Sequence, residues 1–285
     1  MRPLAVAALA FATAAAGHAS DFDAALGLYK ERRYPEARIA LEKIVVAEPK
    51  NASACYHLGM TLRRRSDEKA LADALPWLEK ATQLEPSNAV YLADYGGTAL
   101  LFAAQNTSLN VALKGRDAME KSLRLDPTNV DVRLGLMQFY ERAPWPVGSN
   151  AKAAAQLEEI RKLNPALATV WSVNLKANAK DYAGAFKICE DLLANNPADY
   201  TALYQYGRTA AVSGQNLPKG LGRLQQCAAL PEPGSPAPTH SDVWNRIGHI
   251  REQLAQPTEA RAAYETALKL NPANRTAAAA LQKLK

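Results

Sequence analysis

The sequence predicts an all-α fold: a right-handed α-solenoid of about seven helix-turn-helix units, followed by a C-terminal capping helix. Two observations support this prediction. The octets that begin at Ala81, Ser122 and Ala267 (ATQLEPSN, SLRLDPTN and ALKLNPAN) repeat one pattern of a small residue, leucine, proline and asparagine. Prolines in this role recur every 32 to 41 residues along the chain. A period in this range is typical of stacked helical hairpins.

Each octet combines the end of one helix with the start of the next. Proline disfavours helical geometry in the residue before it, so the first helix ends there. A side chain shortly after the proline can cap the next helix, and we expect this of Asn88, Asn129, Asn274 and, in the equivalent place, Asp199. The sequence therefore predicts both boundaries of each helical hairpin.

This pattern divides the 285 residues into consecutive segments. We expect a signal peptide at 1–19, repeats at 20–51, 52–88, 89–129, 130–165, 166–199, 200–231 and 241–274, a proline-rich linker at 232–240 and a capping helix at 275–285. A single hairpin cannot bury its apolar face alone, so each unit is expected to be stabilised by its neighbours.

The first segment has the composition of a secretory signal. Arg2 precedes an apolar run from Leu4 to Ala16, and small residues follow at Gly17 and Ala19. The run is shorter than a membrane-spanning helix requires and is mostly alanine. We expect cleavage near Ala19, no membrane insertion afterwards, and a periplasmic or, alternatively, secreted protein.

The last repeat carries the fullest version of the pattern. It contains Trp244, Ile247, Gly248, Ala260, Tyr264, Ala267 and Pro272. This spacing resembles the tetratricopeptide repeat, with Arg251 in place of a tyrosine. The other units match less fully, and those from Val130 and Ala166 have weak first helices. The stretches APWPVG and YGRTAAVSGQNLPKG also resemble exported bacterial tetratricopeptide-repeat proteins.

The family pattern has a packing reason. Small residues let the two helices of a hairpin approach closely. We expect this at the positions Gly59, Gly96, Gly207 and Gly248, against Ala74, Gly115, Gly220 and Ala260 respectively. Longer spacings predict insertions near Ser66–Ala72, near Gln105–Leu113 and at 143–150, where prolines exclude helix.

The chain offers little that indicates catalysis. Four histidines occur, and none lies in a zinc-binding, nucleophile-elbow, phosphate-loop or haem-attachment motif. The sequence predicts no enzyme, no cofactor and no metal. A net charge of +6, with Arg63–Arg65 as the only basic run, gives no basis for nucleic-acid binding.

A solenoid of this kind binds partners on the concave surface formed by the first helix of each hairpin. The sequence places these residues there: Tyr56, Arg63, Gln138, Arg142, Asn174, Asn178, Tyr204, Arg208, Asn245 and His249, with Met60, Ala93, Gly97, Val212 and Gln253. Their mixture of aromatic, amide and cationic side chains suits an extended peptide. Trp145, in the inserted loop, is a candidate anchor for a partner, although a loop tryptophan more often folds back over its own hairpin.

Some members of the family hold a peptide's C-terminal carboxylate in a clamp of lysine, asparagine and arginine. Asn174 and Arg208 match two positions of that clamp, whereas Leu134 and Tyr204 stand where lysines belong and Gln138 replaces an asparagine. The comparison therefore predicts that the clamp is absent.

The three cysteines, Cys55, Cys189 and Cys227, cannot all pair within one chain. Cys189 and Cys227 are free to form a disulfide in an oxidising compartment, but both fall at core positions where a buried thiol acts as a small apolar side chain. The second interpretation is preferred.

The sequence thus favours an exported, non-enzymatic scaffold or adaptor that binds a protein or peptide partner of the bacterial envelope in its concave groove. One alternative is a chaperone-like factor in the maturation of exported proteins, similar to tetratricopeptide parts of cytochrome c assembly systems. Another is an enzyme or carbohydrate-acting protein that uses groove residues such as His249 and Glu252.

Overall fold

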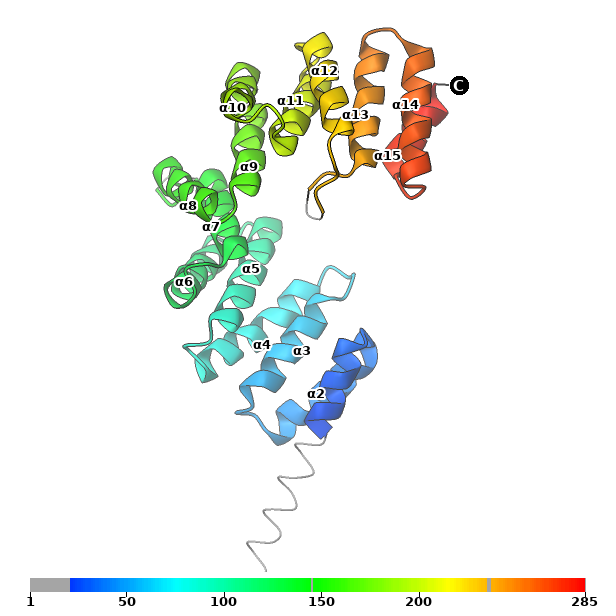
Figure 1. Ribbon diagram of the computed structural model, residues 1–285. Coiled ribbons are helices and arrows are strands. Elements are labelled where there is room, and N and C mark those ends of the chain that lie inside the picture. Colours follow the sequence, from blue (N-terminus) through cyan, green and yellow to red (C-terminus); the bar gives the residue numbers. More distant parts are fainter. Residues whose placement is uncertain (1–20, 145, 235–236, 285) are drawn as a thin grey trace, which may run out of the picture. The chain divides into compact units, whose positions relative to one another are not determined.

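The computed structural model describes residues 21–144, 146–234 and 237–284. The predicted signal peptide and Trp145 lie outside the described residues. Within the described ranges the chain is helical and contains no strand (Figure 1). The predicted all-α fold is therefore confirmed. None of the helices in these ranges combines the length and the apolar character needed to cross a membrane.

The chain divides into two compact units, Met1–Gln156 and Leu157–Lys285. In unit 1, residues 21–30 are helical, and α2 (Tyr34–Ala47), α3 (Ala52–Arg63), α4 (Ala70–Leu84), α5 (Ala89–Asn106), α6 (Leu109–Leu125) and α7 (Val130–Arg142) follow. The boundary falls within α8 (Asn150–Leu163). Unit 2 contains α9 (Pro165–Asn178), α10 (Tyr182–Asn195), α11 (Tyr200–Ser213), α12 (Leu217–Ala229), α13 (His240–Gln253), α14 (Pro257–Leu270) and α15 (Arg275–Lys283).

Each unit is a stack of helical hairpins. The helices of the pairs α3–α4 and α5–α6 in unit 1 pack against each other, as do α11–α12 and α13–α14 in unit 2 (Figure 1). Successive hairpins share a buried seam. Leu41, Leu58 and Leu78 are fully enclosed in unit 1, and Leu203 and Leu224 in unit 2. This continuous burial is the source of stability expected of a solenoid.

The side chains predicted to cap helices do so. The Asn88 side chain accepts hydrogen bonds from the Val90 and Tyr91 amides at the start of α5. Asn129, Asp199 and Asn274 accept one bond each, at the starts of α7, α11 and α15. These bonds satisfy amides that have no partner within their own helix. The repeated octet therefore works as predicted.

The predicted close approach within hairpins is also present. A Cβ added at Gly96 would lie 2.7 Å from the Gly115 carbonyl oxygen, and one at Gly59 would lie 3.2 Å from the Ala74 carbonyl oxygen. At Gly248 the contact differs, because a Cβ there would meet the ring of Tyr264 at 2.4 Å. Small residues thus admit either the neighbouring backbone or a large side chain.

The extra residues predicted near Gln105–Leu113 lengthen the two helices that meet there. Helix α5 is 18 residues long and α6 is 17, with only Thr107 and Ser108 between them. Thr107 adopts the left-handed conformation at φ 51°, which lets the chain reverse within two residues. The weak first helices from Val130 and Ala166 are nevertheless formed, as α7 and α9.

Candidate functional site

A hollow in the described part of unit 1 has a volume of about 820 Å3. Its walls come from α3, α5 and α7, which are first helices of consecutive hairpins, and from the turn between α5 and α6. We call this hollow the unit 1 groove. The residues that line it include Arg63, Val90, Asp94, Gly97, Leu101, Leu109, Gln138 and Arg142.

Five of the residues predicted to face a partner meet in this groove. Arg63 comes from α3, Ala93 and Gly97 from α5, and Gln138 and Arg142 from α7. The 3.6-residue period places residues four apart on one face of a helix, which is why the pairs on α5 and α7 face the same hollow.

Apolar side chains are unusually accessible here. Val90 is 56% exposed, Leu101 48% and Leu109 53%, and all three line the groove. Gly97 leaves further room, since a Cβ added at this position would meet no atom within 4 Å. Contiguous exposed apolar surface that is rimmed by polar residues typically marks a binding site.

A polar network at the groove centres on Asp94. The Tyr56 hydroxyl donates to its Oδ2 at 2.7 Å, and Arg63 Nη1 lies 3.7 Å from its Oδ1. Tyr56 also stacks on Tyr91, with ring centroids 4.5 Å apart. Burial, and next the bond to Asp94, raise the pKa of Tyr56, so its hydroxyl stays a donor. Tyr56, which is not among the residues that line the groove, therefore holds Asp94 in place.

Sequence reasoning missed Asp94. It lies three residues before Gly97, which was identified, and helix neighbours at that spacing share a face. The spacing was therefore an available signal. The network leaves Arg142, at the exposed end of α7, as a cation that faces the same hollow as the three apolar side chains.

The predicted surface residues of unit 2 behave differently. Tyr204 is only 7% exposed and Asn245 only 3%, so the expectation that they line an open surface is wrong. Tyr204 belongs to the core of unit 2, and Asn245 donates through Nδ2 to Thr276 Oγ1 at 3.3 Å. Met60 in unit 1 is likewise buried. Positions next to a hairpin's seam can be covered by the following helix, which periodicity alone does not reveal.

Asn174 and Arg208 do come together. Arg208 Nη1 on α11 donates to Asn174 Oδ1 on α9, and Asn178 remains exposed at the end of α9. Burial lowers the pKa of Arg208, and the positive charge of Arg246 lowers it further. Val212 and Gln253 are exposed.

His249 and Glu252, the residues of the enzyme hypothesis, both contact Tyr264. The His249 ring packs edge-on against the Tyr264 ring, with centroids 5.6 Å apart, and Glu252 accepts a hydrogen bond from the Tyr264 hydroxyl at 2.8 Å. Burial and the nearby Arg246 lower the pKa of His249. Across the described ranges, no three His, Cys, Asp or Glu residues are grouped to hold a metal.

The cysteines are free and buried. Burial raises the pKa of Cys189 and of Cys227 to about 12, and it raises that of Cys55 as well. Cys227 Sγ also contacts the Tyr200 carbonyl oxygen at 3.6 Å. The disulfide between Cys189 and Cys227 is therefore not formed in this structure, and both thiols pack as small apolar groups.

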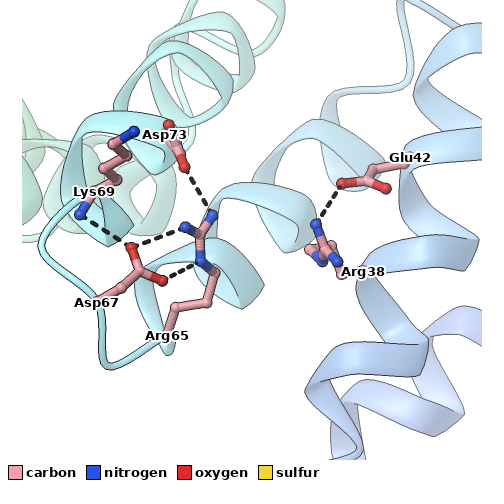
Figure 2. Close-up of polar contacts among 6 residues, drawn as sticks. All are labelled: Arg38, Glu42, Arg65, Asp67, Lys69 and Asp73. Atoms are coloured by element: carbon pink, nitrogen blue, oxygen red, sulfur yellow. Dashed lines mark hydrogen bonds and ion pairs between the residues drawn. The ribbon is translucent and has the colours of Figure 1, made fainter.

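The basic run Arg63–Arg65 is engaged within unit 1. Figure 2 shows Arg65 bonded to Asp67 and to Asp73, each with a nitrogen–oxygen distance of 2.7 Å. Arg38 and Glu42 form a separate pair on α2 at 3.3 Å. Arg65 therefore acts locally, joining the α3–α4 turn to the first turn of α4.

Comparisons with known proteins agree with this architecture. Residues 241–274 match the sequence profile of the tetratricopeptide repeat. No curated protein matches the chain in sequence. Among solved structures, a tetratricopeptide repeat protein from Parabacteroides merdae is 14% identical, with a TM-score of 0.56 over 94% of this chain and 98% of that chain.

Two further structures are similar in fold. The C-terminal part of a TPR repeat-containing protein from Cytophaga hutchinsonii is 15% identical, with a TM-score of 0.53 over 91% of this chain and 99% of that one. Yeast Tom70 is 16% identical, with a TM-score of 0.59 over 88% of this chain. The chain spans about half of the Tom70 structure, namely 51%.

Fold and surface together define a helical-repeat scaffold of the kind that binds other proteins. Residues 241–274 are a tetratricopeptide repeat, and the hairpins before them have the fold of solved tetratricopeptide-repeat proteins. The family resemblance of the sequence is thus supported by the match over residues 241–274 and, for the rest of the described chain, by the fold.

Proposed function

We propose that this chain is an exported scaffold that binds an apolar segment of another envelope protein in the unit 1 groove. The observation that carries the proposal is the groove itself, where three large apolar side chains remain about half exposed beside charged and amide groups. The helical-repeat fold is an argument for a protein partner of some kind. The groove is the argument for this particular binding site.

The size and lining of the groove suit a peptide segment. Binding hollows of a few hundred to about 1,000 Å3, with mostly apolar walls and a few oriented polar groups, are typical of ligand sites. Val90, Leu101 and Leu109 offer apolar contact, and Gly97 lets a bound chain approach α5 closely. A partner that buries these side chains removes apolar area from water, which is the main driving force of association.

The polar groups favour one type of segment. Asp94 is already satisfied by Tyr56 and Arg63, so it adds little attraction for a cation. Arg142 lies at the end of the groove, next to Phe139, Ala143 and Pro144. An apolar segment that carries an acidic residue near one end matches this arrangement.

Two glycines provide a matched test of the groove. Gly97 lies in the groove on α5, and Gly222 lies on the second helix α12 of unit 2. Both are partly exposed, and an added Cβ meets no atom within 4 Å at either position. Leucine at either position should keep the fold and raise helix propensity by about 1 kcal/mol. Only Gly97→Leu fills the groove.

The experiment captures the tagged chain from cell envelopes and quantifies the proteins recovered with the wild type and with each variant. We expect one stoichiometric partner with the wild type and with Gly222→Leu, and at least a tenfold loss, roughly 1.4 kcal/mol, with Gly97→Leu. Equal recovery from all three forms contradicts the groove assignment. Recovery of many unfolded clients would favour the chaperone-like alternative.

Export is tested separately. The apolar run of residues 4–16 and the small residues before Ser20 support cleavage near Ala19. N-terminal sequencing of the protein from a periplasmic fraction should therefore begin at or near Ser20. Protein that retains Met1 in the cytoplasmic fraction would contradict the envelope location without affecting the groove.

A further inference from the structure

Several half-buried arginines in the described part of unit 2 form no ion pair with a carboxylate, and two of them, Arg208 and Arg246, lie on helices that pack together. Arg208 lies on α11 and Arg246 on α13, both first helices of their hairpins. Arg208 Nη1 donates to Asn174 Oδ1 and, at 3.4 Å, to Gln205 Oε1, and both acceptors are neutral amides. A charged donor that is held only by amides keeps its attraction for an anion.

Arg246 is less satisfied still. Its Nε is buried without a hydrogen-bond partner, and the same holds for Oδ1 of the neighbouring Asn245. Thr209 Oγ1, on α11, is a third atom of this kind. Buried polar atoms normally have partners, and leaving one unpaired costs free energy. Of the four such side-chain atoms in the described residues, Arg246 Nε and Thr209 Oγ1 lie on α13 and α11 and can donate to an anion, whereas Asn245 Oδ1 can only accept a hydrogen bond.

The two helices are packed together. Gln253 Nε2 on α13 donates to the Ala211 carbonyl oxygen of α11 at 2.7 Å. Arg246 is close enough to Arg208 for its charge to lower the Arg208 pKa, after the larger effect of burial. The two cations therefore oppose each other in the absence of an anion.

The other charged groups around Arg246 do not cancel the positive charge of the two arginines. Lys283 adds positive charge near His249, which is partly buried and has a lowered pKa, and Glu252 is the nearby carboxylate. Glu252 already accepts a hydrogen bond from the Tyr264 hydroxyl at 2.8 Å. Two guanidinium groups against one engaged carboxylate make the site cationic overall.

We propose that Arg208 and Arg246 together bind an oxyanion, a carboxylate or a phosphate group, on the adjoining helices α11 and α13. Guanidinium groups present paired N–H donors that match the oxygens of either group. This pair differs from the lysine–asparagine–arginine clamp considered for the sequence, in which Arg246 had no part. The inference concerns unit 2 alone and does not rest on the unit 1 groove.

The test is a nuclear magnetic resonance titration of the whole chain that follows the arginine Nε–H signals at constant ionic strength. One arm adds inorganic phosphate in exchange for chloride. The other adds an N-acetylated alanine tripeptide with a free C-terminal carboxylate, with its C-terminal amide as control. Arg208→Gln and Arg246→Gln assign the two signals and remove one guanidinium each.

Arg251→Gln is the matched control, because Arg251 is also half-buried on α13 but donates to Gln256 within its own hairpin. We expect saturable shifts of the Arg208 and Arg246 signals in at least one arm. Each of the two variants should weaken binding about tenfold, as expected for loss of one charge-assisted partner, and Arg251→Gln should have no effect.

The arms identify the source of the oxyanion. A response to phosphate alone assigns a phosphate group, and a response to the peptide acid but not to its amide assigns a carboxylate. No saturable shift in either arm, or parallel shifts of all arginine signals, would overturn the proposal. Circular dichroism keeps this test independent of folding, since Arg246→Gln relieves the repulsion and should melt no lower than the wild type.

Discussion

Adjacent glycines in α5 allow a sharp test of how the hairpins pack. Gly96 faces α6, and a Cβ added there would lie 2.4 Å from Met119 Cγ and 2.7 Å from the Gly115 carbonyl oxygen. Gly97 faces the groove, and its added Cβ would meet no atom within 4 Å. Alanine at these two positions changes the same chemical group in opposite environments.

The expected magnitudes follow from two opposing effects. Alanine in place of a helical glycine gains about 1 kcal/mol through helix propensity at either position. At Gly96 the new methyl group must also displace backbone, because a carbonyl oxygen cannot rotate away as a side-chain end can. Such overpacking costs about 1–3 kcal/mol. Gly97→Ala should therefore stabilise by about 1 kcal/mol, and Gly96→Ala should be less stable than Gly97→Ala by about 1–3 kcal/mol.

The assay is urea unfolding followed by far-ultraviolet circular dichroism, together with native-state hydrogen exchange of the α5 amides. Hydrogen exchange reports local stability, which matters because repeat proteins need not unfold in one step. If Gly96→Ala proves as stable as Gly97→Ala, the two helices do not meet closely there, and the packing argument fails.

Three further predictions concern buried groups. Because burial raises the pKa of Cys189 and Cys227 from 9.0 to about 12, iodoacetamide at pH 8 should label them only after unfolding, and stability should fall as pH rises above about 9, where the unfolded thiols lose protons first. Labelling of the native chain, read by mass spectrometry, would contradict this. The pKa values of His57 and His249 are lowered from 6.5, chiefly by burial, so the unfolded state binds more protons and the melting temperature should drop as pH falls below about 6.5; a melting temperature unchanged down to pH 5 would refute this. Asn274→Ala removes the cap of α15 and the bond to Ser241 Oγ, and should cost about 1–2 kcal/mol in urea unfolding, whereas no loss would mean that α15 does not depend on its cap.

Much of the fold can be predicted from the sequence because the residues that determine it act on their near neighbours in the chain. Proline ends a helix and asparagine caps the next through atoms only a few residues apart, so Asn88 and Asn129 could be assigned roles without knowing the rest of the structure. The role of Gly96 could be predicted in the same way, since only a small residue fits where two helix backbones meet.

The binding surface was harder to predict because exposure depends on neighbouring hairpins. Arg63 and Arg142 line one hollow, but Tyr204 and Asn245, to which the same periodicity assigned a place on the concave surface, are buried. Arg246 was not selected at all. Its importance comes from a missing partner and a nearby like charge, neither of which a one-dimensional pattern contains.

The form of the insertion near Gln105–Leu113 could not be predicted from the sequence. A longer spacing between two octets can mean a loop or extra helical turns, and the sequence near Gln105 contains no proline to decide between them. In the structure the extra residues are helical turns of α5 and α6. Leu101 on α5 and Leu109 on α6 both line the groove. The lengthened helices therefore contribute two of the apolar side chains on which the proposed function depends.

The most direct test of that function compares two leucines of unit 1. Leu101 lies in the groove and is 48% exposed, and Leu125, at the end of the second helix α6, is 45% exposed and outside it. A photo-crosslinking amino acid at each position, activated in living cells, reports what touches that site. We predict a discrete protein adduct from position 101 and none from position 125. An adduct from position 125 alone would place the binding surface elsewhere and contradict the assignment of the groove.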